Sequence, residues 1–169
     1  MIRNAFVLST FCLALTAGGC TPKQPEPSQP KAAEQPDYHP SLGDLMTFAV
    51  QPRHIKLGIA GHARNWTYAV YEASELRNAF KRIGRTIPTY KDQSLNDLFA
   101  SSILPSLDGL DAAIKAQDGA KFDAAYKDVT AGCDACHASL GKSFVVIREP
   151  STSPYADQDL ATPATGVAK

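Results

Sequence analysis

Residues 120–140 read AKFDAAYKDVTAGCDACHASL and carry the strongest pattern in the chain. Apolar and sulfur-bearing residues recur every three or four positions, which predicts a helix from about Ala120 to Leu140. Gly141 follows and is well placed to cap that helix. The residues that share the inward face of this helix are Phe122, Tyr126, Val129, Cys133, Cys136, His137 and Leu140.

Within this helix, Cys133-Asp134-Ala135-Cys136-His137 has the form C-x-x-C-H, the attachment motif of a c-type haem. Two thiols one helical turn apart can each add to a vinyl group on the same edge of a porphyrin. The imidazole after the second thiol is then held under the iron, where a neutral ring nitrogen can bind it. The sequence therefore predicts one covalent haem c, bound through Cys133 and Cys136 and ligated by His137.

Two other interpretations of the cysteine pair compete with haem attachment. A thioredoxin-like C-x-x-C pair is expected after a strand and at the start of a helix, and no strand pattern precedes these residues. A zinc site needs a second pair of ligands, and the sequence holds no other close Cys/His pair. Haem attachment is the interpretation that the sequence favours.

Three further helical patterns precede the motif. The first runs from about Ser41, a candidate N-cap, to Ala60, and Pro52 is expected to kink or divide it before Gly61 ends it. Its apolar face holds Leu42, Leu45, Met46, Ala49, Val50, Leu57 and Ala60.

The second and third patterns have the same three-four spacing. The second runs from about Asn65 to Arg82, with Gly84 and Pro88 expected to stop it. The third opens at Ser94, with Asp97 three residues on, and is expected to bend at Pro105. The apolar faces hold Trp66, Ala69, Val70, Ala73, Leu76, Phe80 and Ile83 in the second helix, and Leu95, Leu98, Phe99, Ile103, Leu107, Leu110 and Ile114 in the third.

Four apolar-striped helices joined by short connections predict an all-α domain over residues 41–148, an up-and-down antiparallel four-helix bundle. No alternating strand pattern competes. The apolar run from Phe144 to Ile147 is expected to fold back on the domain. Residues 149–169 are small and polar and are predicted to be disordered.

The N-terminal residues 1–19 have the pattern of a secretory signal peptide, with Arg3 before a short apolar core and Ala17-Gly18-Gly19 as the exit. Cys20 follows directly. The run resembles a bacterial lipoprotein cleavage box, although Ala17 stands where such boxes usually carry Leu. Cys20 is therefore predicted to be lipidated; the alternative is ordinary cleavage that leaves a free thiol.

Residues 20–40 are rich in Pro, Gln, Lys and Glu and are predicted to form an extended tether that holds the domain away from a membrane. A merely disordered N-terminus has the same composition. With Cys12 removed in the signal peptide, Cys20 lipidated, and Cys133 and Cys136 bound to haem, no disulfide is required.

The composition is ordinary for a soluble protein, with 44% hydrophobic and 20% charged residues. The formal net charge is zero, so nothing indicates nucleic acid as a partner. The sequence has no G-x-S-x-G motif, no phosphate loop and no local pair of carboxylates. Apart from the chemistry of a haem, the sequence therefore indicates no enzyme.

With the motif near the end of the fourth helix, residues 41–148 resemble cytochrome c′ and its six-coordinate relatives, the four-helix-bundle class of c-type cytochromes. The resemblance implies that Cys133 and Cys136 form the thioethers and that His137 is the proximal iron ligand. It also implies that the first helix supplies whatever faces the other side of the iron. Cytochromes c′ often carry Arg four residues after the proximal His, whereas this chain has Gly141 there, followed by Lys142.

The family also implies where such a protein works. Its haem is attached outside the cytoplasm, which places this chain in the periplasm of a Gram-negative bacterium, anchored through Cys20. The expected partners are redox proteins of the cell envelope. Members of the class often form homodimers, so the resemblance implies that this chain pairs with a second copy.

The residue opposite His137 decides between functions. Met46 is the one Met besides the initiator, and its thioether is either a distal iron ligand or a core filler. His54 lies two turns further on and is expected on the flank or surface, while His62 is expected in a loop and His39 in the tether.

The leading hypothesis is electron transfer by Fe(II)/Fe(III) cycling at a six-coordinate haem. The rival is a five-coordinate protein that binds NO or CO at an open iron face. A third hypothesis is a weak haem peroxidase or nitric oxide detoxifier that uses the same open face.

Overall fold

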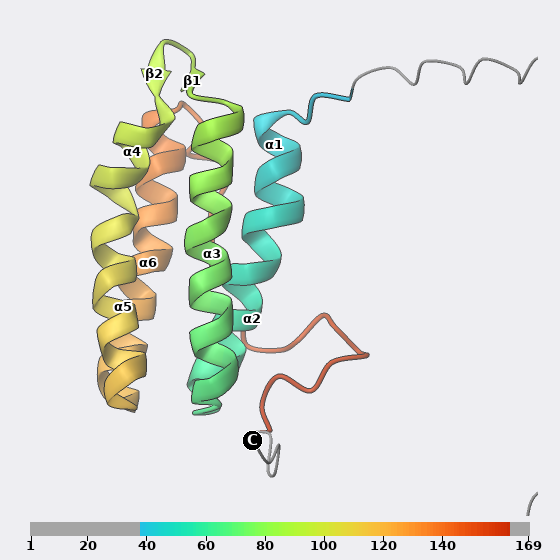
Figure 1. Ribbon diagram of the computed structural model, residues 1–169, viewed down its shortest axis with the longest axis vertical. Helices are drawn as coiled ribbons and strands as arrows, with labels where there is room; N and C mark the ends of the chain where they lie inside the picture. The colour runs from blue at the N-terminus through green and yellow to red at the C-terminus, as the bar shows by residue number, and fades with distance from the viewer. Residues whose placement is uncertain (1–37, 163–169) are drawn as a thin grey trace, which may run out of the picture. The chain divides into compact units, whose positions relative to one another are not determined.

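The computed structural model describes residues 38–162, and these residues are mainly helical (Figure 1). The predicted signal peptide, Cys20, nearly all of the tether and residues 163–169 lie outside the described residues. The elements in chain order are α1 (Leu42–Leu45), η1 (Met46–Val50), α2 (Gln51–His62), α3 (Trp66–Thr86), β1 (Thr89–Tyr90), β2 (Gln93–Ser94), α4 (Leu95–Ser102), α5 (Leu104–Ala116) and α6 (Gly119–Ser139).

The helices pack side by side around one apolar core (Figure 1). Helix α2 contacts α3 and α6, and α5 contacts the same two helices from the other side. Fully buried side chains of every long helix meet between them, among them Leu57, Leu76, Leu107 and Val129. The expectation that the domain is mainly helical is confirmed.

Prolines interrupt two of the predicted helices: a kink or division was expected at Pro52, and a bend was expected at Pro105. Because Pro52 has no amide hydrogen, the regular bond to the carbonyl four residues earlier cannot form there. The preceding segment η1 is a π-helix, in which the Gln51 amide donates to the Met46 carbonyl. Near Pro105 the chain leaves helical geometry at Ile103, whose φ is −117°, and α4 and α5 are separate helices.

Polar side chains fix the predicted helix starts. The Ser41 hydroxyl accepts from the Asp44 amide, and the Asp44 carboxylate accepts from the Ser41 amide, which completes a capping box. Ser94 accepts from the Asp97 amide at the start of α4. Asp118 accepts from the Lys121 amide at the start of α6, so the C-x-x-C-H motif lies at the far end of a capped helix.

Two details of the second helix were predicted wrongly. Gly84 does not stop α3, which continues to Thr86, because Asn96 of α4 packs where a side chain would stand and donates to the Gly84 carbonyl (3.2 Å). Val70 was placed on the buried face but is 56% exposed, and Glu72 is buried instead.

A short hairpin between α3 and α4 was not expected. Strands β1 and β2 pair antiparallel through a two-residue turn, in which Lys91 and Asp92 have φ values of 48° and 63°. The Lys91 ammonium reaches the last turn of α6 and donates to the Leu140 carbonyl (3.1 Å). The hairpin therefore satisfies a carbonyl at the end of the helix that carries the motif.

The tail after residue 149 also differs from expectation. Leu160 is buried, and the Asn65 side chain donates to the carbonyls of Leu160 (3.2 Å) and Thr162 (3.1 Å). The described part of the predicted disordered segment, 149–162, therefore has specific contacts with the start of α3.

The side chains of α6 approach α2 at two glycines. A Cβ atom at Gly58 would overlap the Tyr126 hydroxyl, and one at Gly61 would overlap the Phe122 ring. Both aromatic side chains are fully buried. Their packing against the bare backbone sets the distance between the helix that follows Met46 and the helix that carries the motif.

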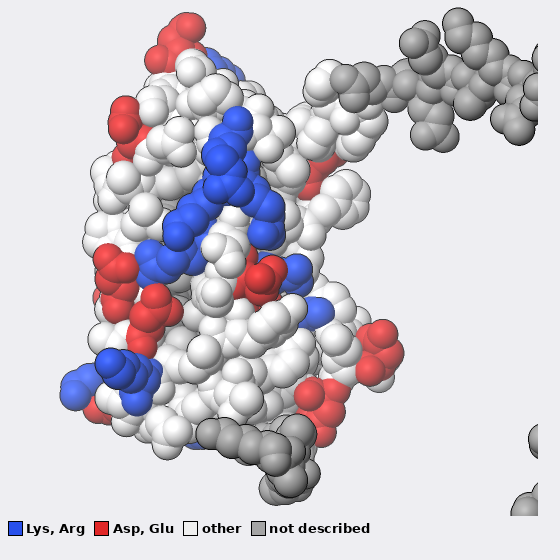
Figure 2. Space-filling model, viewed as in Figure 1, with Lys and Arg blue, Asp and Glu red and all other residues white. Residues whose placement is uncertain are grey.

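The visible charged surface carries both signs. Figure 2 shows Lys and Arg side chains gathered over part of this face, with carboxylates beside them. Arg77 of α3, for example, pairs with Asp108 (2.9 Å) and Asp111 (2.7 Å) of α5.

None of the helices between residues 38 and 162 combines the length and the apolar character that crossing a membrane requires.

The glycine contact can be tested by Gly61→Ala. We expect the free energy of unfolding to fall by roughly 1–3 kcal/mol, because the new methyl group displaces the buried Phe122 ring. Gly109→Ala is the matched control, since a Cβ there meets no atom within 4 Å; it should stabilise α5 by up to about 1 kcal/mol. Urea unfolding measures both. Equal changes in the free energy of unfolding in the two variants would contradict the close approach of α2 and α6.

Candidate functional site

A cavity of about 280 Å³ lies beside the C-terminal half of α6. Its volume is close to the lower limit of small-molecule pockets, roughly 300–1,000 Å³. Met46, Thr47 and Val50 line it from η1, while Cys133, Cys136 and His137 line it from α6. Further walls come from His54, Phe80, Ile103 and residues 145–147. The structure thus brings Met46 and the motif, which are far apart in the sequence, to one cavity.

The surroundings of the two cysteines disfavour the thiolate form that thiol redox chemistry needs. Burial raises the pKa of Cys133 to about 12, and burial also raises the pKa of Cys136. Both thiols lie in the last turns of α6, where the helix dipole disfavours a thiolate. This environment counts against the thioredoxin-like interpretation.

The zinc interpretation also gains nothing from the fold. Across residues 38–162, no group of three or more His, Cys, Asp or Glu side chains is placed to hold a metal ion. The structure therefore brings no additional ligand pair from the described residues to Cys133 and Cys136. Both cysteines are free thiols there.

The chain reverses directly after α6. Gly141 has a φ of 70°, the left-handed conformation that glycine adopts without strain. Its amide donates to the Ala138 carbonyl (3.0 Å), and the Lys142 amide donates to the His137 carbonyl (2.8 Å). This is a Schellman motif, and it returns the following residues 144–147 toward the cavity.

The apolar run from Phe144 to Ile147 does fold back on the domain, as expected. Val145, Val146 and Ile147 line the cavity, and the Val145 carbonyl lies 3.1 Å from Nδ1 of His137. A carbonyl can only accept, so Nδ1 carries the proton. In the neutral imidazole, Nε2 is then the nitrogen with a free lone pair.

Met46 is half-buried at the start of η1 and packs against the core. The π-helix that Pro52 imposes changes the angular position of the residues before it, compared with a regular helix. Met46 is the only thioether in the described residues, and it lines the cavity together with His137.

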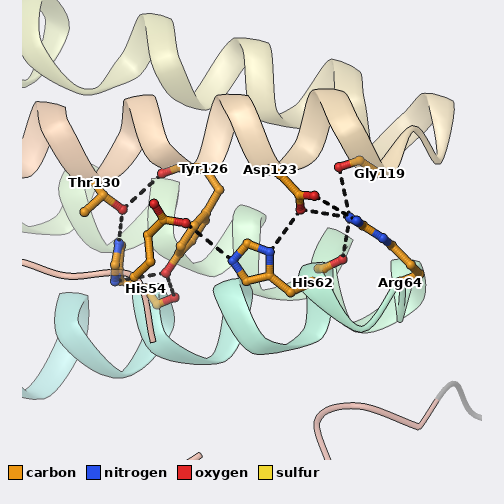
Figure 3. A network of polar contacts seen from close by, with 9 residues as sticks. His54, His62, Arg64, Gly119, Asp123, Tyr126 and Thr130 are labelled. Carbon is orange, nitrogen blue, oxygen red and sulfur yellow. Dashed lines mark hydrogen bonds and ion pairs between the residues drawn. The ribbon is translucent and has the colours of Figure 1, made fainter. Parts of the chain in front are cut away.

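His54 was expected on the flank or surface, and that expectation is wrong. It is 4% exposed, and it lines the cavity. The prediction failed because Tyr126 and Thr130 of α6 cover the ring, as Figure 3 shows. Burial lowers the pKa of His54 to about 4, with the charge of Asp134 opposing.

Both ring nitrogens of the neutral His54 have protein partners. The Thr130 hydroxyl donates to the Tyr126 carbonyl (3.0 Å), so it accepts from Nε2–H of His54 (2.9 Å). Nδ1 is then unprotonated and lies 3.1 Å from the Tyr126 hydroxyl, which donates its proton to the His54 backbone carbonyl (2.7 Å). Each ring nitrogen of His54 therefore lies against a hydroxyl of α6, and binding a metal would require that hydroxyl to move away.

His62 belongs to a separate polar cluster (Figure 3). Its Nδ1 lies 3.0 Å from a carboxylate oxygen of Asp123, which also pairs with Arg64 (2.8 Å). Nε2 of His62 lies 3.7 Å from Glu149. The contacts of His62 join α2, α6 and the tail. His62 does not line the cavity.

Some residues that shape the site could not be identified from the sequence alone. Thr130 and Tyr126 were placed in α6 without a polar role, because their partner His54 belongs to another helix. The contact between His137 and Val145 uses a backbone carbonyl. Every residue type has this group, so no sequence pattern could indicate the contact. The periodicity of the fourth helix predicts Tyr126 as an inward side chain, but it carries no signal for the polar contact with His54.

Comparison of the chain with protein-family models, with curated proteins and with solved structures finds no significant match.

The burial of His54 predicts a specific loss of stability in acid. The folded-state pKa of about 4 is below the ordinary 6.5, so the unfolded chain binds the proton first. The contribution of neutral His54 to the free energy of unfolding is fully present above pH 6.5 and is lost as the pH falls to 4. At 1.36 kcal/mol per pKa unit, the loss is about 3 kcal/mol.

His54→Gln, which cannot titrate, should lose about 3 kcal/mol less than the wild type between pH 7 and pH 4 in urea unfolding. If the free energy of unfolding fell equally with pH in the two proteins, His54 would not be held neutral in the folded state.

Proposed function

We propose that this protein is an exported c-type cytochrome that carries one covalent haem and transfers electrons. Cys133 and Cys136 would hold the macrocycle as thioethers, and His137 would be the proximal ligand. The observation that carries the proposal is the common cavity, in which Met46 and all three motif residues are lining residues.

The residues around the cavity fit a haem. Imidazole and thioether are established haem ligands, and two thiols three residues apart on a helix can reach one porphyrin edge. The remaining walls are largely apolar, with Val50, Phe80 and Ile103 among them. Such walls exclude water from a bound iron and favour its less charged ferrous state.

Each side chain has a separate task in this proposal. The thiols of Cys133 and Cys136 fix the position of the ring, which prevents its loss. The protonated Nδ1 of His137 leaves Nε2 to bind the iron. Met46 is the thioether on the η1 side. A bound haem supplies a one-electron couple between Fe(II) and Fe(III).

Electron transfer is favoured over gas binding and peroxidase chemistry for two reasons. Met46 lines the cavity, and a Met ligand would close the face that NO, CO or peroxide needs. A peroxidase also needs a free acid–base group near that face. Of the described residues that line the cavity, His54 is the candidate, and each of its ring nitrogens lies against a hydroxyl of α6.

We further propose that the domain is an up-and-down four-helix bundle of the cytochrome c′ class. The supporting evidence is that α1–α2, α3, α4–α5 and α6 follow one another through short connections. Neighbours along the chain pack together, and α2 also contacts α6. The break at Ile103 would then be a bend within the third helix of the bundle.

The proposed location rests on the sequence of residues 1–40. A signal peptide over 1–19 and a lipidated Cys20 would place the domain in the periplasm, tethered to a membrane. There it would exchange electrons with redox proteins of the cell envelope.

The electron-transfer proposal is tested by absorption spectra of protein produced in a bacterium that attaches haem to exported chains. We expect a low-spin ferrous spectrum that CO does not change, a near-infrared band from sulfur–iron ligation in the oxidised protein, and reversible oxidation. Met46→Ala should lose the near-infrared band and acquire CO binding, because the distal ligand is gone.

His54→Gln is the matched control, because His54 lines the same cavity but its ring nitrogens lie against Thr130 and Tyr126, and it should keep the near-infrared band. A high-spin wild-type spectrum that shifts with CO would favour the five-coordinate alternative. A low-spin spectrum unchanged in Met46→Ala would remove Met46 as the ligand.

A further inference from the structure

The segment after α6 is attached to that helix at two points besides the contact with His137. The Schellman motif at Gly141 is the first. The second is the Ile147 amide, which donates to the Asp134 carboxylate (2.8 Å). Between these points lies Val145, whose carbonyl accepts from Nδ1–H of His137 (3.1 Å).

Asp134 is one of the two variable residues of the C-x-x-C-H motif, and it precedes His137 by one helical turn. It is half-buried, and its contact with Ile147 is a charge-assisted hydrogen bond, which is stronger than a neutral one. Val145 is 36% exposed, whereas Phe144 and Val146 are mostly exposed, at 80% and 62%. The Val145 amide also donates to the Lys142 carbonyl (2.9 Å), so the near end of the segment is held at Gly141 and Lys142, and Asp134 is the contact that holds its far end.

A hydrogen bond from the second nitrogen of a ligating histidine has known consequences. It fixes the tautomer and the orientation of the ring, and it raises the basicity of the nitrogen that binds the metal. A more basic imidazole donates more electron density, which stabilises Fe(III) over Fe(II). The Val145 carbonyl is placed to have this effect on His137.

We propose that Asp134 is a positioning residue for His137. It holds residues 144–147 in place, so that the Val145 carbonyl accepts from the imidazole and lowers the reduction potential of the bound iron. The inference rests on the proposed haem function and adds to it a residue that sets the potential.

The test compares Asp134→Ala with Asp134→Asn by redox titration of the haem-loaded protein. Both variants remove the negative charge, but the Asn side chain keeps an oxygen that accepts from the Ile147 amide. We expect a higher potential in Asp134→Ala than in Asp134→Asn, because only Ala frees the Val145 carbonyl from His137. Asp128→Ala, which removes an exposed carboxylate of the same helix, is the control for helix charge.

Amide hydrogen exchange gives a readout that needs no redox signal. Exchange over residues 144–147 should accelerate in Asp134→Ala and stay near the wild-type rate in Asp134→Asn. Equal potentials in the two variants would overturn the inference, as would a lower potential in Asp134→Ala, which would mean that the segment acts by excluding water. A colourless wild-type protein would instead overturn the proposed function.

Discussion

Phe122 and Tyr126 of α6 pack directly on the backbone of α2, where Gly58 and Gly61 have no side chains. The cavity depends on this contact. Helix α2 continues from η1, which holds Met46, and α6 ends in the motif. The distance between the two cavity walls is therefore set by two aromatic rings further along the same pair of helices. Any change that separates these helices would also separate Met46 from His137.

Two backbone constraints then give the cavity its shape. The missing amide hydrogen of Pro52 places a π-helix before α2, and this π-helix carries three of the lining residues. The left-handed conformation of Gly141 turns the chain back after α6, which brings 145–147 onto the opposite side. Pro52 thus shapes one cavity wall, because its nitrogen cannot donate a hydrogen bond. Gly141 shapes the other wall, because it has no side chain.

Local features were predictable from the sequence, and tertiary features were not. The caps at Ser41 and Ser94, and the breaks at Pro52 and Pro105, depend on a few neighbouring residues, and each was expected. Gly84 was misjudged because the group that packs against it, Asn96, comes from the next helix. His54 was misjudged for the same reason, since its partners Tyr126 and Thr130 belong to α6. The proposed haem chemistry rests on the motif, which is local in the sequence, but the Asp134 and Val145 contacts depend on how the chain folds back.

The central claim is that Cys133 and Cys136 bind one haem covalently. The most direct measurement is the intact mass of the mature protein under denaturing conditions, which release any cofactor that is not covalently bound. The claim predicts a mass larger than that of the polypeptide by one haem, and the polypeptide mass alone in a variant with both cysteines changed to Ala. A wild-type mass without the added haem, from cells able to attach it, would contradict the claim.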